Sequence, residues 1–440
     1  MQIDHASSLK QTTLEQTTPE QTTLRPMSCA RAPRCAPATI RALAATAALA
    51  AGLALGGAAE GQVTLEYLSA PPGDWSAAAY GCSADGLTGA VTYFAPRLRA
   101  VRWNSTGTGS PLAAPVSTHS ALGWAVSGNG GTVIGWSEFS GSGPSVRRPL
   151  IWRGALPPLD LGNLPGMNAG KAIASNFDAS VVVGSSEPYA FSNTFYGFRW
   201  TPKGGMVALP GPAGLPSMIP TDVSDNGESI VGDAAQQACR VTGSPGAFSV
   251  QSLGLLPGMS ASTAAAVSGD GATVVGSSSS FFDEKPFKWT SETGMVALPM
   301  PSGFGRALDA NNDGSTIVGE RSVSGATHAA AWTTNLGFVN LNTYLDAAGV
   351  SRGGDTLSTA TGVSRNGRVI VGFTSGGKAF RIRNFNAPPP VPGDVDGDGV
   401  VDSTDLGVLL SNWGGSGAGD LNGDGIVNSA DLGILLSAWS

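Results

Sequence analysis

Residues 126–135 read VSGNGGTVIG, and variants of this ten-residue pattern return throughout the chain. The pattern is an apolar residue, Ser or Asn, any residue, Asp or Asn, Gly, two further residues, two Val or Ile residues, and Gly. The Asn-Gly or Asp-Gly pair predicts a tight hairpin turn with positive φ at both turn residues. The apolar run that follows predicts a strand buried on both faces. Four more copies and two looser ones begin at Val223, Val267, Ala310, Val363, Cys82 and Ala174.

A second short motif follows each copy of the turn. Apolar or small residues occupy its last position and the position two before, with Arg or Lys between them in five of seven copies. This alternation has the period of a β-strand. A third apolar segment, such as GMVALP at 205–210, follows six copies and predicts another short strand. The motif ends at Trp103, Trp152, Trp200, Val241, Trp289, Trp332 and Ile382, with spacings of 49, 48, 41, 48, 43 and 50 residues.

About four short strands per repeat is the content of one β-propeller blade, and seven such units can close into a ring. The seventh repeat ends in KAFRIRNF at 378–385 and lacks a last strand, whereas residues 62–68, QVTLEYL, form a strand without a repeat of their own. That strand could complete the last blade and remove an aggregation-prone edge. We therefore expect a mainly β protein, a seven-repeat β-propeller over residues 62–385. An open β-solenoid of the same units is the alternative.

The strand motif resembles that of the extracellular HAF-type repeats, which are named for His-Ala-Phe. The three positions read HAA at 328–330 and KAF at 378–380, and RWT at 199–201 keeps the Arg-Trp-Thr that follows. The resemblance covers about residues 75–385. It implies an exported, repetitive β protein and no established chemistry, so it assigns no catalytic residue.

The net charge of the protein lies at its C-terminus. From Asp394 onward there are eight Asp and no Glu, Lys or Arg, so this segment has a charge of −8. Because the whole chain has a net charge of −7, the preceding 393 residues sum to +1. Acidity confined to the tail indicates no nucleic-acid partner.

Two segments of this tail, GDVDGDGVVDSTD at 393–405 and GDLNGDGIVNSAD at 419–431, match the first half of the calcium-loop pattern D-x-[DN]-x-[DN]-G. Hard oxygen ligands at this spacing suit Ca²⁺, which accepts six to eight of them. We predict two bound Ca²⁺ ions; a disordered acidic tail is the alternative. Position 12 of both loops is Asp and not the usual Glu. The expected ligands are Asp394, Asp396, Asp398, the Val400 carbonyl, Asp402 and Asp405 in loop one, and Asp420, Asn422, Asp424, the Ile426 carbonyl, Asn428 and Asp431 in loop two.

An apolar stripe follows each loop at the i, i+3, i+4, i+7 spacing of a helix face. We expect two short helices that bury these stripes against each other. The stripes are Leu406, Leu409, Leu410 and Trp413, and Leu432, Leu435, Leu436 and Trp439.

The loop-and-helix duplication over 393–440 resembles a type I dockerin. The resemblance implies an EF-hand-like calcium module at 394–440, after a Pro-rich linker at 386–393, that docks to a cohesin-like module or a cell-surface scaffold. In dockerins the pair of residues before position 12 helps to choose the partner. That pair is Ser403 and Thr404 in loop one and Ser429 and Ala430 in loop two, where Ala430 departs from the pattern.

The N-terminal residues 1–61 predict a targeting segment. Residues 1–26 are polar, Arg31, Arg34 and Arg41 form a basic region, and residues 42–59 are apolar and end in small residues. This is the order of a secretory signal peptide, with Met27 as an alternative start and a membrane anchor as the alternative interpretation. We expect export to the extracellular space or cell surface, with no stable membrane insertion after cleavage. Cleavage would remove Cys29 and Cys35 and leave Cys82 and Cys239. These two either form a disulfide, as an oxidising compartment allows, or stay as two free thiols.

Catalytic patterns are weak in the repeat region. His119 and His328 do not adjoin a nucleophile motif, and Ser83 in GCSADG occupies the Ser position of the repeated turn. The turn aspartates alternate with Asn, which suits a turn that accepts backbone hydrogen bonds. We expect a secreted, non-catalytic repeat protein that is anchored or assembled through a calcium-dependent dockerin–cohesin-type interaction. The alternative is a carbohydrate-active enzyme or carbohydrate-binding propeller displayed by the dockerin, with a polysaccharide as partner and the repeated tryptophans as its binding face.

Overall fold

The computed structural model describes residues 62–69, 76–83, 88–94, 97–113, 120–139, 146–189, 192, 194–212, 215, 217–386, 393, 395, 401, 403–417, 419–422 and 424–439. The expected signal segment at 1–61 and most of the expected linker lie outside these residues. No helix in the described ranges is long and apolar enough to cross a membrane.

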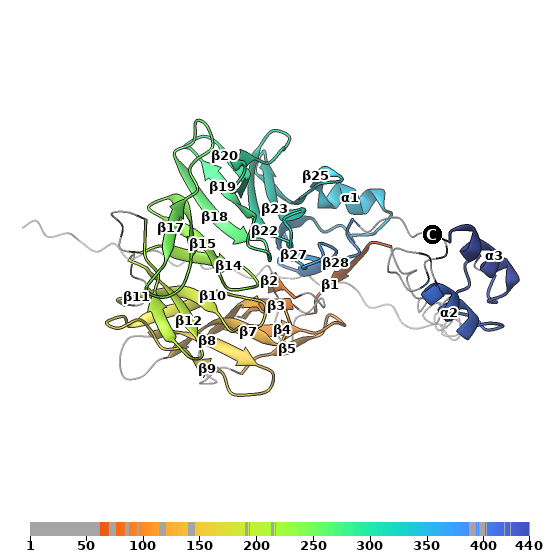
Figure 1. The fold of residues 1–440 in the computed structure, drawn as a ribbon, viewed down its shortest axis with the longest axis horizontal. Helices are drawn as coiled ribbons and strands as arrows, with labels where there is room; N and C mark the ends of the chain where they lie inside the picture. The colour runs from red at the N-terminus through yellow and green to blue at the C-terminus, as the bar shows by residue number, and fades with distance from the viewer. Residues whose placement is uncertain are drawn as a thin grey trace, which may run out of the picture. The chain divides into compact units, whose positions relative to one another are not determined.

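The described strands form seven antiparallel sheets of four strands each (Figure 1). Six sheets use consecutive strands, each starting with the strand nearest the central pocket described below. The first three are β2 (Ser76–Cys82), β3 (Thr88–Phe94), β4 (Arg97–Trp103) and β5 (Gly109–Pro111); β6 (Ala121–Val126), β7 (Thr132–Phe139), β8 (Val146–Arg153) and β9 (Leu159–Asp160); and β10 (Ala169–Ser175), β11 (Val182–Glu187), β12 (Tyr196–Thr201) and β13 (Gly205–Ala208).

The next three sheets repeat this plan, with β18 to β20, for example, carrying the VSGDGATVVG turn and the KPFKW strand. They are β14 (Ile219–Val223), β15 (Ser229–Ala234), β16 (Gln237–Thr242) and β17 (Ser249–Ser252); β18 (Ala261–Val267), β19 (Val274–Ser279), β20 (Glu284–Thr290) and β21 (Gly294–Ala297); and β22 (Phe304–Ala310), β23 (Thr316–Val323), β24 (Ala326–Thr333) and β25 (Gly337–Asn340).

The seventh sheet joins the two ends of the repeat region. Its order is β1-β28-β27-β26, from β1 (Thr64–Tyr67), β26 (Leu357–Val363), β27 (Ile370–Thr374) and β28 (Ala379–Arg383). β1 pairs antiparallel with β28, with Leu65 opposite Ile382, and the strands β26 to β28 pack against β2 of the first sheet. The prediction of a mainly β propeller is confirmed, because the last sheet meets the first and the ring is closed.

A buried arginine fastens this closure. Arg381 of β28 has no exposed surface, and its Nη2 lies 2.5 Å from Glu66 Oε2 of β1. The same guanidinium donates to the carbonyl oxygens of Asn104 (3.2 Å) and Ser105 (2.8 Å) in the turn between β4 and β5. One side chain therefore ties the last strand to the N-terminal strand and to the first sheet.

The repeated turns hold their shape by side-chain hydrogen bonds. The Ser127 hydroxyl donates to Asn129 Oδ1 (2.8 Å) and accepts from the Thr132 N–H (3.0 Å), and Asn129 Oδ1 accepts from the Gly131 N–H (2.9 Å). Only the glycine, Gly130 with φ of 69°, adopts positive φ, so the expectation of positive φ at both turn residues is wrong. Asn or Asp serves here as a hydrogen-bond acceptor for the N–H two residues on, a role that needs no left-handed backbone.

Most tryptophans of the strand motif belong to the core. Three of their indole N–H groups donate hydrogen bonds of 2.7–2.8 Å to backbone carbonyl oxygens of neighbouring connecting segments. Buried indoles normally need such a partner, so these side chains pack the blades and do not form an exposed binding face. The pairs are Trp103 with Ser69, Trp152 with Ala113, and Trp332 with Pro299.

Both cysteines in the described residues are free thiols. Cys239 lies buried in β16, where burial raises its pKa to about 12, and Cys82 at the end of β2 is partly exposed. Of the two alternatives from the sequence, the structure has the free thiols.

The helices are short. α1 (Leu341–Ala347) follows β25, and the C-terminal module contains α2 (Ser403–Ser411) and α3 (Ser429–Ser437). The module buries Val401, Leu409, Val427 and Leu435 as one cluster. The expectation that each whole stripe is buried is wrong, because two nine-residue helices meet along a single line. Four stripe residues stay about half exposed: Leu410, Trp413, Leu436 and Trp439.

Candidate functional sites: the calcium loops and the central pocket

Loop two of the C-terminal module brings its expected ligands together. Asp420 carboxylate oxygens accept from the backbone N–H groups of Asp424 (3.2 Å) and Gly425 (2.8 Å). Asn422 Oδ1 accepts from the Asp424 N–H (2.9 Å), and its Nδ2 donates to Asp424 Oδ2 (2.9 Å). Asn428 Nδ2 donates to the Ile426 carbonyl (2.9 Å) and to Asp424 Oδ2 (3.5 Å). These hydrogen bonds link positions 1, 3, 5, 7 and 9 of the loop to one another.

Asp431, at position 12, closes the loop from the helix side. Its carboxylate accepts from the N–H groups of Leu421 (2.7 Å), Asn422 (3.0 Å) and Asn428 (2.8 Å). The hydrogen bonds from these N–H groups, with that from Asn428 first, lower the pKa of Asp431, which keeps it charged. Asn428 also caps α3, since its Oδ1 accepts from the Ala430 N–H (2.7 Å).

The residue set of loop two fits a hard cation. Carboxylate, amide and carbonyl oxygens from Asp420, Asn422, Asp424 and Ile426 are the ligands Ca²⁺ prefers. In the part of the chain that the structure describes, no three acidic, His or Cys side chains gather as a metal cluster. Amide N–H donors of Asn422 and Asn428 hold these acceptors together instead, in the position where a cation would draw them together.

Loop one lies largely outside the described residues, and with it the expected ligands Asp394, Asp396, Asp398, Val400 and Asp402. Asp405 is described, and it repeats the role of Asp431: it is buried and its Oδ1 accepts from the Val395 N–H at 2.6 Å, as Asp431 accepts from Leu421.

Two glycines repeat the same packing in the two halves of the module. Gly393 has φ of 101° and Gly419 has φ of 102°. A Cβ on Gly393 would lie 3.0 Å from Leu435 Cα, and a Cβ on Gly419 would lie 3.0 Å from Leu409 Cα. Each loop thus begins on a glycine pressed against the opposite helix, so the module has an internal two-fold relation.

The expected partner-binding residues lie at the first turns of the two helices. Ser403 and Thr404 begin α2, Ser429 and Ala430 begin α3, and all four are exposed. Each helix also carries one half-exposed Leu, Leu410 or Leu436, and a half-exposed Trp follows its last residue, Trp413 after α2 or Trp439 after α3.

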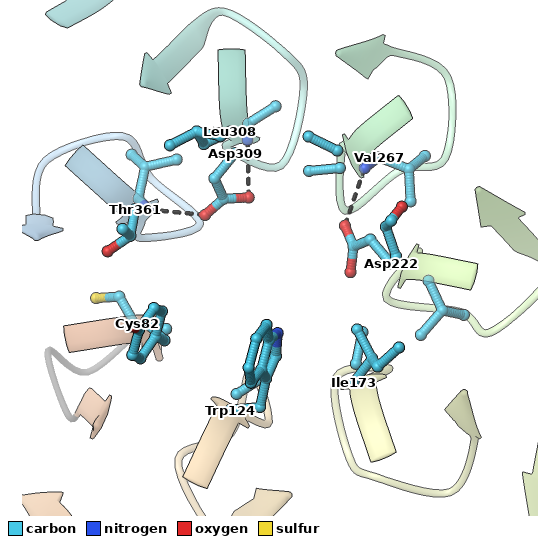
Figure 2. A pocket seen from close by; sticks show the side chains of 18 of the residues that line it. Cys82, Trp124, Ile173, Asp222, Val267, Leu308, Asp309 and Thr361 are labelled. Carbon is cyan, nitrogen blue, oxygen red and sulfur yellow. Dashed lines mark hydrogen bonds between the residues drawn. The ribbon is translucent and has the colours of Figure 1, made fainter. Parts of the chain in front are cut away.

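A separate cavity of about 630 Å³ lies in the middle of the propeller, lined by the innermost strands β2, β6, β10, β14, β18, β22 and β26; we call it the central pocket (Figure 2). Each of these strands shifts its register beside the cavity, and β26 does so twice. Such a bulge re-aims a side chain. In each strand the residue at one such shift lines the pocket: Tyr80, Trp124, Ile173, Thr221, Ala265, Leu308 and Thr361.

One wall of the central pocket is aromatic. Tyr80 and Trp124 stack with their ring centroids 5.5 Å apart and their planes 9° from parallel. Phe373 lies beside Tyr80, at 6.5 Å between centroids. Trp124 keeps 38% of its surface exposed, unlike the buried tryptophans of the strand motif.

The opposite side of the central pocket carries two carboxyl groups, Asp222 and Asp309 (Figure 2). Asp222 Oδ2 accepts from the Val267 N–H of the next sheet (2.9 Å), and Asp309 Oδ2 accepts from the Val363 N–H (2.8 Å). Burial raises the pKa of Asp222 to about 8 and that of Asp309 to about 7, and the Asp309 carboxyl adds to the rise at Asp222.

Residues from the repeated turns meet across the ring and narrow one end of the pocket. The Arg365 guanidinium lies 5.0 Å from the Phe177 ring centroid, donates to Asn312 Oδ1 (3.0 Å) and pairs with Asp225 Oδ2 (3.3 Å). We call Phe177, Asp225, Asn312 and Arg365 the pocket floor. In four repeats they occupy the variable position directly before the Asp or Asn of the turn.

The pocket floor is closely packed at the glycines between these residues. A Cβ on Gly128 would lie 2.4 Å from the Phe177 ring, and a Cβ on Gly269 would lie 2.6 Å from the side chains of Asp225 and Asn312. Two repeats thus carry Gly at the third turn position to make room for the floor side chains of the others.

Sequence reasoning did not predict the central pocket. Its signals were present: Asp222 and Asp309 directly follow the register shift of their strands, at a position that is Gly81, Ala125, Ala174, Ala266 or Gly362 in the other five sheets. In the six repeats whose turns the structure describes, the position directly before the turn Asp or Asn varies between Gly, Phe, Asp, Asn and Arg, and all six residues line the pocket.

No protein-family model matches the chain, and no curated protein matches its sequence. Among solved structures, the chain is similar to a virginiamycin B lyase from Staphylococcus aureus at 13% identity and a TM-score of 0.48, over 73% of this chain and 99% of that one. An oligogalacturonate lyase from Vibrio parahaemolyticus gives 11% identity and 0.48, over 73% and 97%. TolB from Acinetobacter baumannii gives 14% and 0.40, over 68% and 79%. These similarities carry no statement about activity, and the propeller assignment rests on the strand topology described above.

Proposed function

We propose that this chain is an exported, non-catalytic repeat protein in which a seven-bladed propeller is displayed by a calcium-dependent docking module. The module would bind two Ca²⁺ ions, one per loop, and dock in the dockerin manner to a cohesin-like module or a cell-surface scaffold. The observation that carries the proposal is the hydrogen-bond network that joins Asp420, Asn422, Asp424, the Ile426 carbonyl and Asn428 in loop two. Loop one has the same ligand spacing in sequence.

Calcium affinity tests the metal part of the proposal. Calorimetry on the full chain after chelation should show about two sites, and circular dichroism should show a gain of helix on addition of Ca²⁺, because the ligands converge only in the folded loops. Asp420→Asn should weaken one site about ten-fold or more, since it removes the charge of a first ligand. Asp270→Asn in a propeller turn is the matched control, because Asn already fills that turn position at Asn129, Asn226 and Asn366. Two intact sites in Asp420→Asn, or equal helix with and without Ca²⁺, would contradict the proposal.

The docking surface is proposed to lie on α2, where hydroxyls and apolar surface occur together. Ser403 and Thr404 are exposed. Leu410 on the same helix is 51% exposed, and Trp413, two residues after the helix ends, is 48% exposed. A buried cluster of large apolar side chains with a polar rim is typical of protein–protein interfaces. Ca²⁺ would fix the first turn of α2 through Asp405, the last ligand of loop one.

Partner capture tests the docking part. The full chain should retain cohesin modules or a native cell-surface fraction in Ca²⁺ and release them in chelator. Ser403→Ala with Thr404→Ala should weaken capture with little change in calcium affinity, at about 0.5–1.5 kcal/mol per lost hydrogen bond. Ser429→Ala is the matched comparison and should matter less, because Ala430 has already removed one hydroxyl from that pair. Equal capture by the double variant and the parent would exclude α2 as the docking helix.

A further inference from the structure

The central pocket contains two carboxyl groups that have no cationic partner. In the described part of the chain, neither Asp222 nor Asp309 forms an ion pair, whereas the other charged groups of the pocket do. Arg365 pairs with Asp225 at the floor, and Arg306 pairs with Glu284 (2.9 Å) and Glu320 (3.8 Å). The pocket is therefore short of positive charge beside Asp222 and Asp309.

The fold does not require these two aspartates. The equivalent position is Gly or Ala in the other five repeats, for example Ala174 and Ala266, and those sheets pack into the same ring. Removing a carboxyl group from water without a counter-charge costs free energy. Two such groups on one side of a single pocket therefore lower the stability of the fold. Their hydrogen bonds to Val267 and Val363 do not explain why both are present.

The wall opposite the carboxyl groups is suited to a cation with apolar substituents. Trp124 is 38% exposed, stacks on Tyr80, and faces Asp222 and Asp309 across the pocket (Figure 2). The faces of Trp and Tyr attract ammonium groups and also bury alkyl surface. A neutral ligand would use this wall but would gain nothing from the charge of the carboxyl groups in their ionised form.

We propose that the central pocket binds a small organic cation, an amine or quaternary ammonium compound whose charged nitrogen lies beside Asp222 and Asp309 and whose apolar part packs on Trp124 and Tyr80. The cavity of about 630 Å³ is of the size that small ligands occupy. This site is independent of the proposed docking function, since it uses no residue of the C-terminal module.

Choline and its neutral isostere 3,3-dimethyl-1-butanol form the probe pair. Titrations of the full chain at about pH 9, where both carboxyl groups are largely ionised, in constant Ca²⁺ and followed by calorimetry and tryptophan fluorescence, should show choline binding about ten-fold tighter than the neutral alcohol. Asp222→Asn with Asp309→Asn should remove that preference, because Asn keeps an oxygen acceptor for the N–H groups of Val267 and Val363 but carries no charge. Trp124→Leu should weaken both probes.

The matched control is Asp270→Asn, which removes one carboxylate from an exposed turn outside the pocket and should bind choline like the parent. Thermal melting of each variant establishes that the ring is intact. The proposal is overturned if choline and its isostere bind equally, if choline does not bind, or if the folded double Asn variant binds choline like the parent. Tighter binding of a neutral methyl glycoside would identify a sugar site instead, and displacement of choline by Ca²⁺ would identify a metal site.

Discussion

The propeller and the C-terminal module are both built from repeated sequence, but they use repetition in opposite ways. In the propeller the repeated residues, such as Ser127 with Asn129 or the buried Trp152, form turns and packing between sheets. The candidate ligand residues Asp222 and Asp309 are at positions where the repeats differ. In the module the repeated residues are themselves the candidate ligands, because each loop would surround its own ion. In a ring of many units, departures from the repeat therefore point to the site.

The largest effect on stability is expected from opening the ring, which the propeller closes and the module does not need. Deleting residues 62–68 removes β1, exposes the edge of β28 and leaves the buried Arg381 without Glu66. A sheet edge opened in this way promotes aggregation, so we expect a large loss of thermal stability and increased light scattering. Glu66→Ala, which keeps the strand, should cost about 2 kcal/mol through the lost charged hydrogen bonds. Unchanged melting after the deletion would show that β1 is dispensable.

A smaller effect is expected from the repeated glycines of the module. Gly419→Ala places a Cβ at φ of 102° and 3.0 Å from Leu409 Cα, which should destabilise the module by about 1–2 kcal/mol or more. Gly433→Ala in α3 is the matched control, because no atom lies within 4 Å of the added Cβ and Ala stabilises a helix by up to about 1 kcal/mol over Gly. Denaturation followed by circular dichroism in Ca²⁺ should separate the two variants. Equal stability of both would mean that the packing at Gly419 is not the constraint we infer.

The strands and turns of the propeller could be predicted because the same sequence pattern occurs in each repeat. Seven copies of one turn and one strand pattern fix the strands, and the lone strand at 62–68 indicates its partner. Which face of each strand meets the pocket could not be predicted, because a single bulge decides whether Trp124 or Ala125 points inward. In the module, spacing predicted which residues of loop two hydrogen-bond to one another as candidate ligands. It did not predict that Leu410 and Trp413 remain half exposed, since that depends on how two short helices cross.

The smallest predicted effect is a pH dependence of folding stability, which distinguishes Asp222 and Asp309 from the repeated turn aspartates. Burial raises their pKa values to about 8 and about 7, above the usual value for Asp of about 4. Between about pH 4 and pH 8 the folded protein therefore holds more protons than the unfolded chain. Its stability should consequently fall as pH rises through this window. The other charged groups around the pocket are Asp225, Glu320, Arg306 and Arg365.

Asp222→Asn with Asp309→Asn removes both titrations, so the double variant should match the parent near pH 4 and exceed it near pH 8.5. We expect a gain of the order of 1 kcal/mol, because both side chains keep part of their surface exposed and water reduces the cost of their charge. Urea denaturation at several pH values in constant Ca²⁺ measures the difference, with Asp270→Asn as the control that should follow the parent. If the stability of the double variant falls with pH as steeply as that of the parent, other ionisable groups cause the pH dependence. In that case the two carboxyl groups would be no different from those of the turns.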